Sequence, residues 1–129
     1  MSAKTAIPLT EAVISNEVET VRTLLSSGVD VDQQDKIGYT ALHYAAQNYL
    51  LDIALVLLEH KASVDAKDTY GNTPLFRAVF NSKGRGDMIQ LLLIFGADKD
   101  SKNNHGVSPI ELAKTIANYS IVQFFDDVG

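Results

Sequence analysis

The sequence predicts an all-α repeat solenoid, in which four helix-turn-helix repeats stack side by side and are joined by hairpin-like loops. A pair containing Pro or Ala recurs at intervals of 33, 33 and 35 residues: Pro8-Leu9, Ala41-Leu42, Pro74-Leu75 and Pro109-Ile110. Two further signals keep the same step: the glycines Gly38, Gly71 and Gly106, and the pairs Leu24-Leu25, Leu57-Leu58 and Leu92-Leu93. A fixed period of about 20–50 residues is typical of stacked repeats.

The first helix of each repeat is predicted from its start signal and its apolar spacing. Thr40 and Thr73 precede the apolar residues and are good N-caps, because a threonine hydroxyl accepts a hydrogen bond from a free N–H at the helix start. Pro74 suits the first helical position, where its missing N–H is no loss. The small residues Ala45-Ala46 then allow a second helix to pack closely.

The second helix carries an apolar stripe, formed in repeat two by Ile53, Val56 and Leu57. Gly28 and Gly96 follow second helices, at the position where a helix ends in a left-handed residue. A single helix pair could not bury its apolar face alone. Stacking between neighbouring repeats therefore makes the core.

Two positions depart from the repeat. Lys61 replaces the expected helix-ending glycine, at a cost of about 1 kcal/mol if the residue is left-handed there. Residues 81–86 make the connection between the helices of repeat three longer by two residues than its counterpart in repeat two. One interpretation is a tolerated surface insertion, since exposed loops lengthen cheaply. The other is a mobile basic finger, in which Lys83 and Arg85 touch an acidic patch of a partner.

We expect a single domain, residues 1–129, with repeats at about 2–34, 35–67, 68–102 and 103–129. A chain of 129 residues with 46% hydrophobic content is ample for one core. The ends are polar, with Glu11, Glu17 and Glu19 in the first repeat and Asp126-Asp127 in the last. The first and last repeats are therefore expected to act as caps on a monomeric stack.

Charge narrows the class of partner. The net charge is −5, so nucleic acid and anionic membranes would repel the chain, and we expect neither as a partner. Residues 1–65 carry nine acidic and four basic residues, whereas the remainder balances. If the acidic residues gather on one face, a basic protein is the expected partner; otherwise they are ordinary solvated charges.

The sequence offers little support for catalysis or for a metal. There is no Cys, and the histidines His43, His60 and His105 do not look convergent enough for a zinc site. No spacing singles out a hydrolase triad, and Gly84-Arg85-Gly86 lacks the lysine of a phosphate-binding loop. We expect no enzyme and no cofactor, and a small hydrolase is the alternative of another class. With no signal peptide or membrane-spanning run, a cytoplasmic location is expected.

The repeat resembles the ankyrin repeat family. Residues 35–46 look like the family signature D-x-x-G-x-T-P-L-H-x-A-A, with Ala41 in place of Pro. Residues 68–78 match up to Leu75 and then have Phe76 in place of His. The first repeat lacks the leading glycine, and the last has Ser108-Pro109-Ile110-Glu111. The resemblance implies a hydrogen bond between the first-helix histidine, His43, and Thr40, and it implies protein binding without naming the partner.

In this family the loop tips and first helices line a concave face on which partners dock. The resemblance implies these partner-binding residues: Lys36, Ile37, Tyr39, Tyr44, Gln47 and Asn48 in repeat two, Thr69, Tyr70, Asn72, Arg77, Phe80 and Asn81 in repeat three, and His105 in the last loop. Aromatic residues and Arg are enriched at interface hot spots. The alternative for each is partial burial against its neighbouring repeat.

Three stretches also resemble small bacterial ankyrin proteins that act as immunity partners of secreted toxins: residues 72–81, 103–109 and 116–119. This resemblance implies that the protein covers a toxin's active site or blocks access to it. An acidic half would suit a basic nuclease cleft. The alternatives are a general ankyrin adaptor or regulator and a repeat segment cut from a longer protein.

Overall fold

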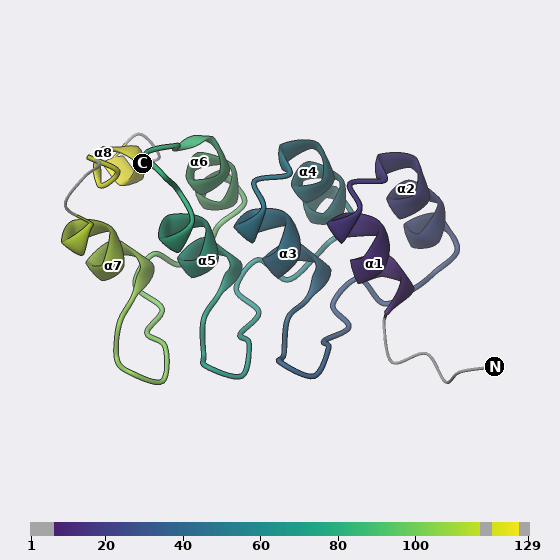
Figure 1. The fold of residues 1–129 in the computed structure, drawn as a ribbon, viewed down its shortest axis with the longest axis horizontal. Coiled ribbons are helices and arrows are strands. Elements are labelled where there is room, and N and C mark those ends of the chain that lie inside the picture. Colours follow the sequence, from purple (N-terminus) through teal and green to yellow (C-terminus); the bar gives the residue numbers. More distant parts are fainter. Residues whose placement is uncertain (1–6, 117–119, 127–129) are drawn as a thin grey trace.

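The computed structural model describes residues 7–116 and 120–126, and these residues form helices and no strand. The helices are α1 (Pro8–Ile14), α2 (Val18–Ser26), α3 (Ala41–Gln47), α4 (Leu51–Glu59), α5 (Pro74–Phe80), α6 (Asp87–Ile94), α7 (Pro109–Thr115) and α8 (Gln123–Asp126). They stack pair by pair in chain order, with α1, α3, α5 and α7 in one row and α2, α4, α6 and α8 in another (Figure 1). The predicted all-α repeat solenoid is confirmed.

Three of the first helices begin at the predicted kind of N-cap. The hydroxyls of Thr40, Thr73 and Ser108 accept hydrogen bonds from the backbone N–H three residues later, at 3.3, 3.2 and 3.2 Å. Pro74 lies within the first turn of α5, where no intrahelical N–H is required. These caps fix where each first helix starts and therefore where the preceding loop ends.

The second helices end as predicted, in left-handed residues. Gly28 has φ 95° and Gly96 has φ 93°, and Lys61 adopts the same region with φ 70°. A side chain in this region is strained by contact between Cβ and the following carbonyl. The predicted strain at Lys61 is therefore present in the fold.

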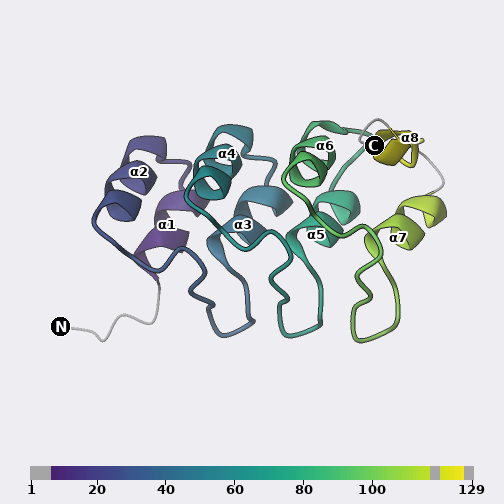
Figure 2. The same ribbon diagram turned by 180° about the vertical axis from the view of Figure 1, so that it is seen from behind.

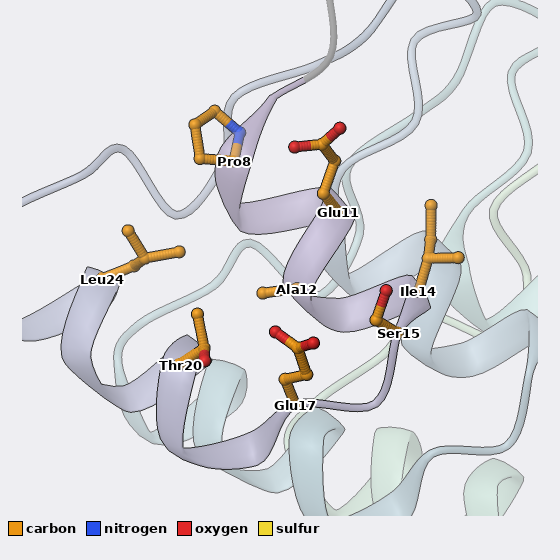
Figure 3. A pocket seen from close by; sticks show the side chains of 8 residues that line it. All are labelled: Pro8, Glu11, Ala12, Ile14, Ser15, Glu17, Thr20 and Leu24. Carbon is orange, nitrogen blue, oxygen red and sulfur yellow. The ribbon is translucent and has the colours of Figure 1, made fainter.

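The core lies between the two rows of helices, and each repeat buries apolar side chains against the next. Fully buried members include Leu42, Ile53, Leu57, Leu75, Met88, Ile89, Leu92 and Ile121. In the first repeat, Thr20 and Glu17 take the positions that Ile53 and Leu50 hold one period later. This end of the stack has a hollow of about 520 Å³ between α1 and α2 with a mixed lining, and Figure 3 shows Glu11 and Glu17 beside apolar residues such as Ile14 and Leu24. These polar positions allow the end face to meet water, as expected for a cap.

The loops between repeats extend from one side of the stack as three parallel fingers, which both views show (Figures 1 and 2). The connections within the repeats join the two rows of helices, at residues 48–50 in repeat two and at the longer 81–86 in repeat three.

Candidate functional site

Each of the three loops holds its tip with the same hydrogen-bonded clasp. Asp35 Oδ1 accepts from the N–H groups of Ile37 and Tyr39, both at 3.0 Å. Asp68 repeats these bonds with the N–H groups two and four residues later, both at 2.9 Å, and Asn103 does so at 2.9 and 3.0 Å. A single side-chain oxygen thus fixes the bend of each loop.

Neighbouring loops are also bonded to one another. Thr69 N–H donates to the carbonyl of Ile37, and Asn104 N–H donates to the carbonyl of Tyr70, both at 3.0 Å. Glycine is required where the loops approach, because Gly38 and Gly71 have φ 79° and a Cβ at Gly71 would lie 2.6 Å from Asn104 Oδ1. The three loops therefore form one continuous lattice.

The lattice presents one exposed side chain at the equivalent tip position of each loop. These tip residues are Ile37, which is 46% exposed, Tyr70, which is 54% exposed, and the exposed His105. The predicted residues Lys36 and Thr69 are exposed beside them. Phe80, at the end of α5, is 64% exposed.

Two of the predicted partner-binding residues are not exposed, and the expectation of an accessible surface is wrong for them. Tyr39 is only 5% exposed: its hydroxyl donates to Gln47 Oε1 at 2.9 Å, and its ring stacks on His43 at 5.0 Å. Asn72 is 7% exposed, and its Oδ1 accepts from Asn103 Nδ2 of the next loop at 2.8 Å. Both positions face a neighbouring element, so their side chains are enclosed by the stack.

Tyr44 and Arg77 stand at equivalent positions, half-buried, and each binds the aspartate of its own loop. The Tyr44 hydroxyl donates to Asp35 Oδ2, and Arg77 Nη2 donates to Asp68 Oδ2 at 3.0 Å. Burial, followed by the bond to Asp35, raises the pKa of Tyr44. The Arg77 guanidinium also lies 5.2 Å from the centroid of the Tyr39 ring. These contacts join the first helices to the loop clasps.

His43 links repeats two and three, and its predicted bond with Thr40 is confirmed. The backbone N–H of Thr40 donates to Nδ1 at 3.1 Å, so the other ring nitrogen carries the proton, and Nε2 donates to the carbonyl of Asn72 at 2.9 Å. The side chain is fully buried, and this burial lowers the pKa of His43. The histidine is a neutral structural bridge, and its polar atoms are already occupied.

The connection at residues 81–86 is not a free finger. Arg85 Nε and Nη2 donate to the carbonyls of Ser82 and Asn81, both at 2.8 Å, and the guanidinium lies 3.9 Å above the ring of Tyr49. The mobile interpretation is wrong for Arg85, because these contacts fasten its side chain to the repeat. Lys83 is exposed.

Sequence reasoning missed Ile14, which is 52% exposed at the end of α1. Ile14, Ile37 and Tyr44 line a hollow of about 370 Å³ between repeats one and two, together with Glu11. The repeat period could have found Ile14, because it lies 33 residues before Gln47, which is a predicted partner-binding residue.

Two other features bear on function, a cluster of metal ligands and a membrane-spanning helix, and neither occurs among the described residues. Within residues 7–116 and 120–126, no group of three or more His, Asp or Glu side chains is placed to hold a metal ion. No helix there is both long and apolar enough to cross a bilayer. Residues 117–119 and Asp127, which entered the sequence argument, lie outside the described residues.

Comparison with known families identifies the repeat. The sequence pattern described as ankyrin repeats in three copies matches residues 9–103. The chain belongs to the ankyrin repeat family. Ankyrin repeats are modules for protein–protein interaction and are generally not catalytic, so this chain is a protein-binding module.

Its relatives share the repeat within longer proteins. The chain is 36% identical over 107 residues to serine/threonine-protein kinase 12 of Arabidopsis thaliana, covering 81% of this chain and 22% of the kinase. It is 38% identical over 86 residues to human BCL-6 corepressor-like protein 1, covering 67% and 5% of the two chains. It is 34% identical over 113 residues to a putative ankyrin repeat protein of Rickettsia bellii, covering 84% and 32%. The chain thus spans less than a third of the length of each of these relatives.

Proposed function

We propose that this ankyrin repeat protein binds its partner through the loop tips and the exposed ends of its first helices. The observation that carries the proposal is the row formed by Ile37, Tyr70 and His105, held in register by the bonded loops. Loops that are already ordered lose little conformational entropy on binding, so more of the contact energy appears as affinity. Exposed Phe80 adds a large apolar side chain of the kind found at hot spots.

The partner proposed for repeats one and two is a basic protein. Glu11 borders the hollow that contains Ile14 and Ile37, and it forms no ion pair with any described residue. Residues 1–65 carry nine acidic residues against four basic ones. Complementary charge accelerates association and suppresses wrong partners. Nucleic acid, membranes and cofactors have no part in this proposal, and the chain acts as a monomeric, cytoplasmic, non-catalytic binder.

The finer form of the proposal is that the partner is a secreted toxin, which the chain neutralises by covering its active site. Its support is the resemblance of residues 72–81 and 103–109 to immunity partners, together with the acidic charge of the first two repeats. The alternative is a regulatory adaptor, which fits the human relative described as a corepressor-like protein.

The test begins with capture of the partner from an extract of the native host, followed by calorimetry with the purified partner. Tyr70→Ala and Ile37→Ala should weaken binding, the stronger of the two at least tenfold, which corresponds to about 1.4 kcal/mol. Leu55→Ala is the matched control, since Leu55 is 38% exposed on α4 in the other helix row, and its affinity should change less than about twofold.

Normal affinity in Tyr70→Ala and Ile37→Ala with a loss in Leu55→Ala would place the partner on the second helices instead. Circular dichroism on each variant separates lost contact from lost fold. The toxin form is tested by co-expressing this chain with the product of the adjacent gene. Protection that is lost in Tyr70→Ala supports immunity, and a harmless neighbour favours the adaptor.

A further inference from the structure

A polar hollow lies where α3 and α5 end, beside the residues inserted in repeat three. Its volume is about 390 Å³, and it is lined by Gln47, Asn48, Asn81, Lys83 and Arg85. The lining holds two cations and three amides and no carboxylate, in a chain of net charge −5. Three other hollows in the described part of the chain each include at least one carboxylate. The local sign of charge is therefore opposite to that of the whole protein.

One of the two cations is held in place before any ligand arrives. Arg85 uses Nε and Nη2 for the carbonyls of Ser82 and Asn81 and rests on the ring of Tyr49. Burial raises the pKa of Tyr49, and its hydroxyl donates to the carbonyl of Ala78, so the ring is fixed as well. The two N–H groups of Arg85 Nη1 have no partner among the described residues.

The other cation is presented by a strained backbone. Lys83 has φ 52° and Gly84 has φ 85°, so two successive residues adopt the left-handed region. This conformation is unfavourable for a lysine, yet the exposed ammonium forms no ion pair with any described residue. Lys83 therefore contributes to the lining of the hollow a cation that no described carboxylate neutralises.

The helix ends at this hollow carry partial negative charge, which disfavours an anion. This charge can be compared with the positive charge of the two cations. The C-terminal ends of α3 and α5 each carry roughly half a negative charge. Lys83 and Arg85 each carry a full positive charge, which together exceeds the charge of the two helix ends. The carboxylate of Asp87 acts on Tyr49 beside Arg85 but does not line the hollow, so the lining itself is net positive. The amide groups of Asn48 and Gln47 add uncharged N–H donors.

We propose that this hollow binds a carboxylate, and, resting on the proposed function, that the carboxylate is an Asp or Glu side chain of the protein partner. A carboxylate accepts hydrogen bonds from both a guanidinium and an ammonium, and these charge-assisted bonds are the strong ones. The partner then carries basic groups opposite repeats one and two and an acidic group opposite residues 81–86. This reversal of sign fixes the register of the partner along the stack.

The experiment uses a small probe, so that it does not depend on the partner. The ¹⁵N-labelled chain is titrated with the peptide acetyl-Leu-Glu-Glu-Leu-amide and, separately, with its Gln-Gln analogue. The Glu peptide should shift the side-chain NH₂ resonances of Asn48 and Asn81 and the Nε–H of Arg85, and the Gln peptide should leave them in place. Lys83→Glu should reduce these shifts at least fivefold.

Lys114→Glu is the matched control, since it makes the same change of charge at an exposed residue of α7 outside the hollow. It should retain the shifts. Equal shifts with the Gln peptide, or an equal loss in Lys83→Glu and Lys114→Glu, would overturn the proposal. Because the probe replaces the partner, normal titration with unaffected binding in Tyr70→Ala would refute only the proposed docking surface.

Discussion

The substitution Lys61→Gly should stabilise the protein. Lys61 has φ 70°, where an L-residue is strained by about 1–2 kcal/mol. Glycine removes this strain but adds about 0.4–1 kcal/mol of entropy to the unfolded chain. The net gain is about 0.5–1 kcal/mol, or about 2–5 °C in Tm for a domain of this size. Urea unfolding should show a higher midpoint with an unchanged slope.

Two controls isolate the backbone as the cause. Lys61→Ala keeps the Cβ and the strain, so it should bring no gain. Gly28→Ala should destabilise by a similar amount, because alanine is strained at φ 95°. An added Cβ would meet no atom within 4 Å, so a steric clash does not contribute. A gain of equal size in Lys61→Ala would show that removal of the lysine side chain, and not relief of φ, is responsible, and would refute this reasoning.

Other predictions concern His43, the loop lattice and the charge of the first half. Because burial lowers the folded pKa of His43, the unfolded chain binds more protons below its own pKa of about 6.5. Stability should therefore fall as pH drops below that value, and the fall should be shallower in His43→Phe, with His105→Asn as the unchanged control. Gly71→Ala should destabilise by about 1–3 kcal/mol more than Gly106→Ala in thermal unfolding, since both have similar φ but only Gly71 contacts the next loop. Affinity for the partner should fall between low and high salt, and a constant affinity would contradict a basic partner.

The architecture could be predicted from the sequence because the same local signals recur in successive repeats. A threonine cap, a proline and a glycine recur at one spacing, and each determines a local backbone state that the structure contains. The left-handed conformation of Lys61 follows from the same logic, since a non-glycine residue occupies a position defined by glycine elsewhere.

Exposure could not be predicted in the same way, because it depends on the tertiary contacts of individual side chains and not on the repeat period. Tyr39 and Tyr70 look alike in sequence, as aromatics two residues apart in the loop register, yet one is 5% and the other 54% exposed. Tyr39 turns inward because Gln47 accepts its hydroxyl and His43 stacks on its ring. Both partners lie in the same repeat, four and eight residues further on, but this set of side chains does not recur in the other repeats, so the repeat spacing carries no record of it. The contact of the Arg85 guanidinium with the Tyr49 ring also escaped prediction, since Tyr49 lies in the preceding repeat.

In the loops, the residues that determine the backbone shape differ from the residues whose side chains are exposed to a partner. The clasps of Asp35, Asp68 and Asn103 use a side-chain oxygen and backbone N–H groups. The bonds between loops join backbone atoms to one another or involve Asn, Gln, Lys and Asp side chains outside the tip positions. None of them involves the side chain of Ile37 or Tyr70. Substitution at a tip should therefore change what is recognised without loosening the loop, whereas a change at a clasp should displace its own tip and the neighbour bonded to it. On the proposed docking surface, specificity therefore depends on the side chains at the tips, and the spacing between the tips depends on the clasps.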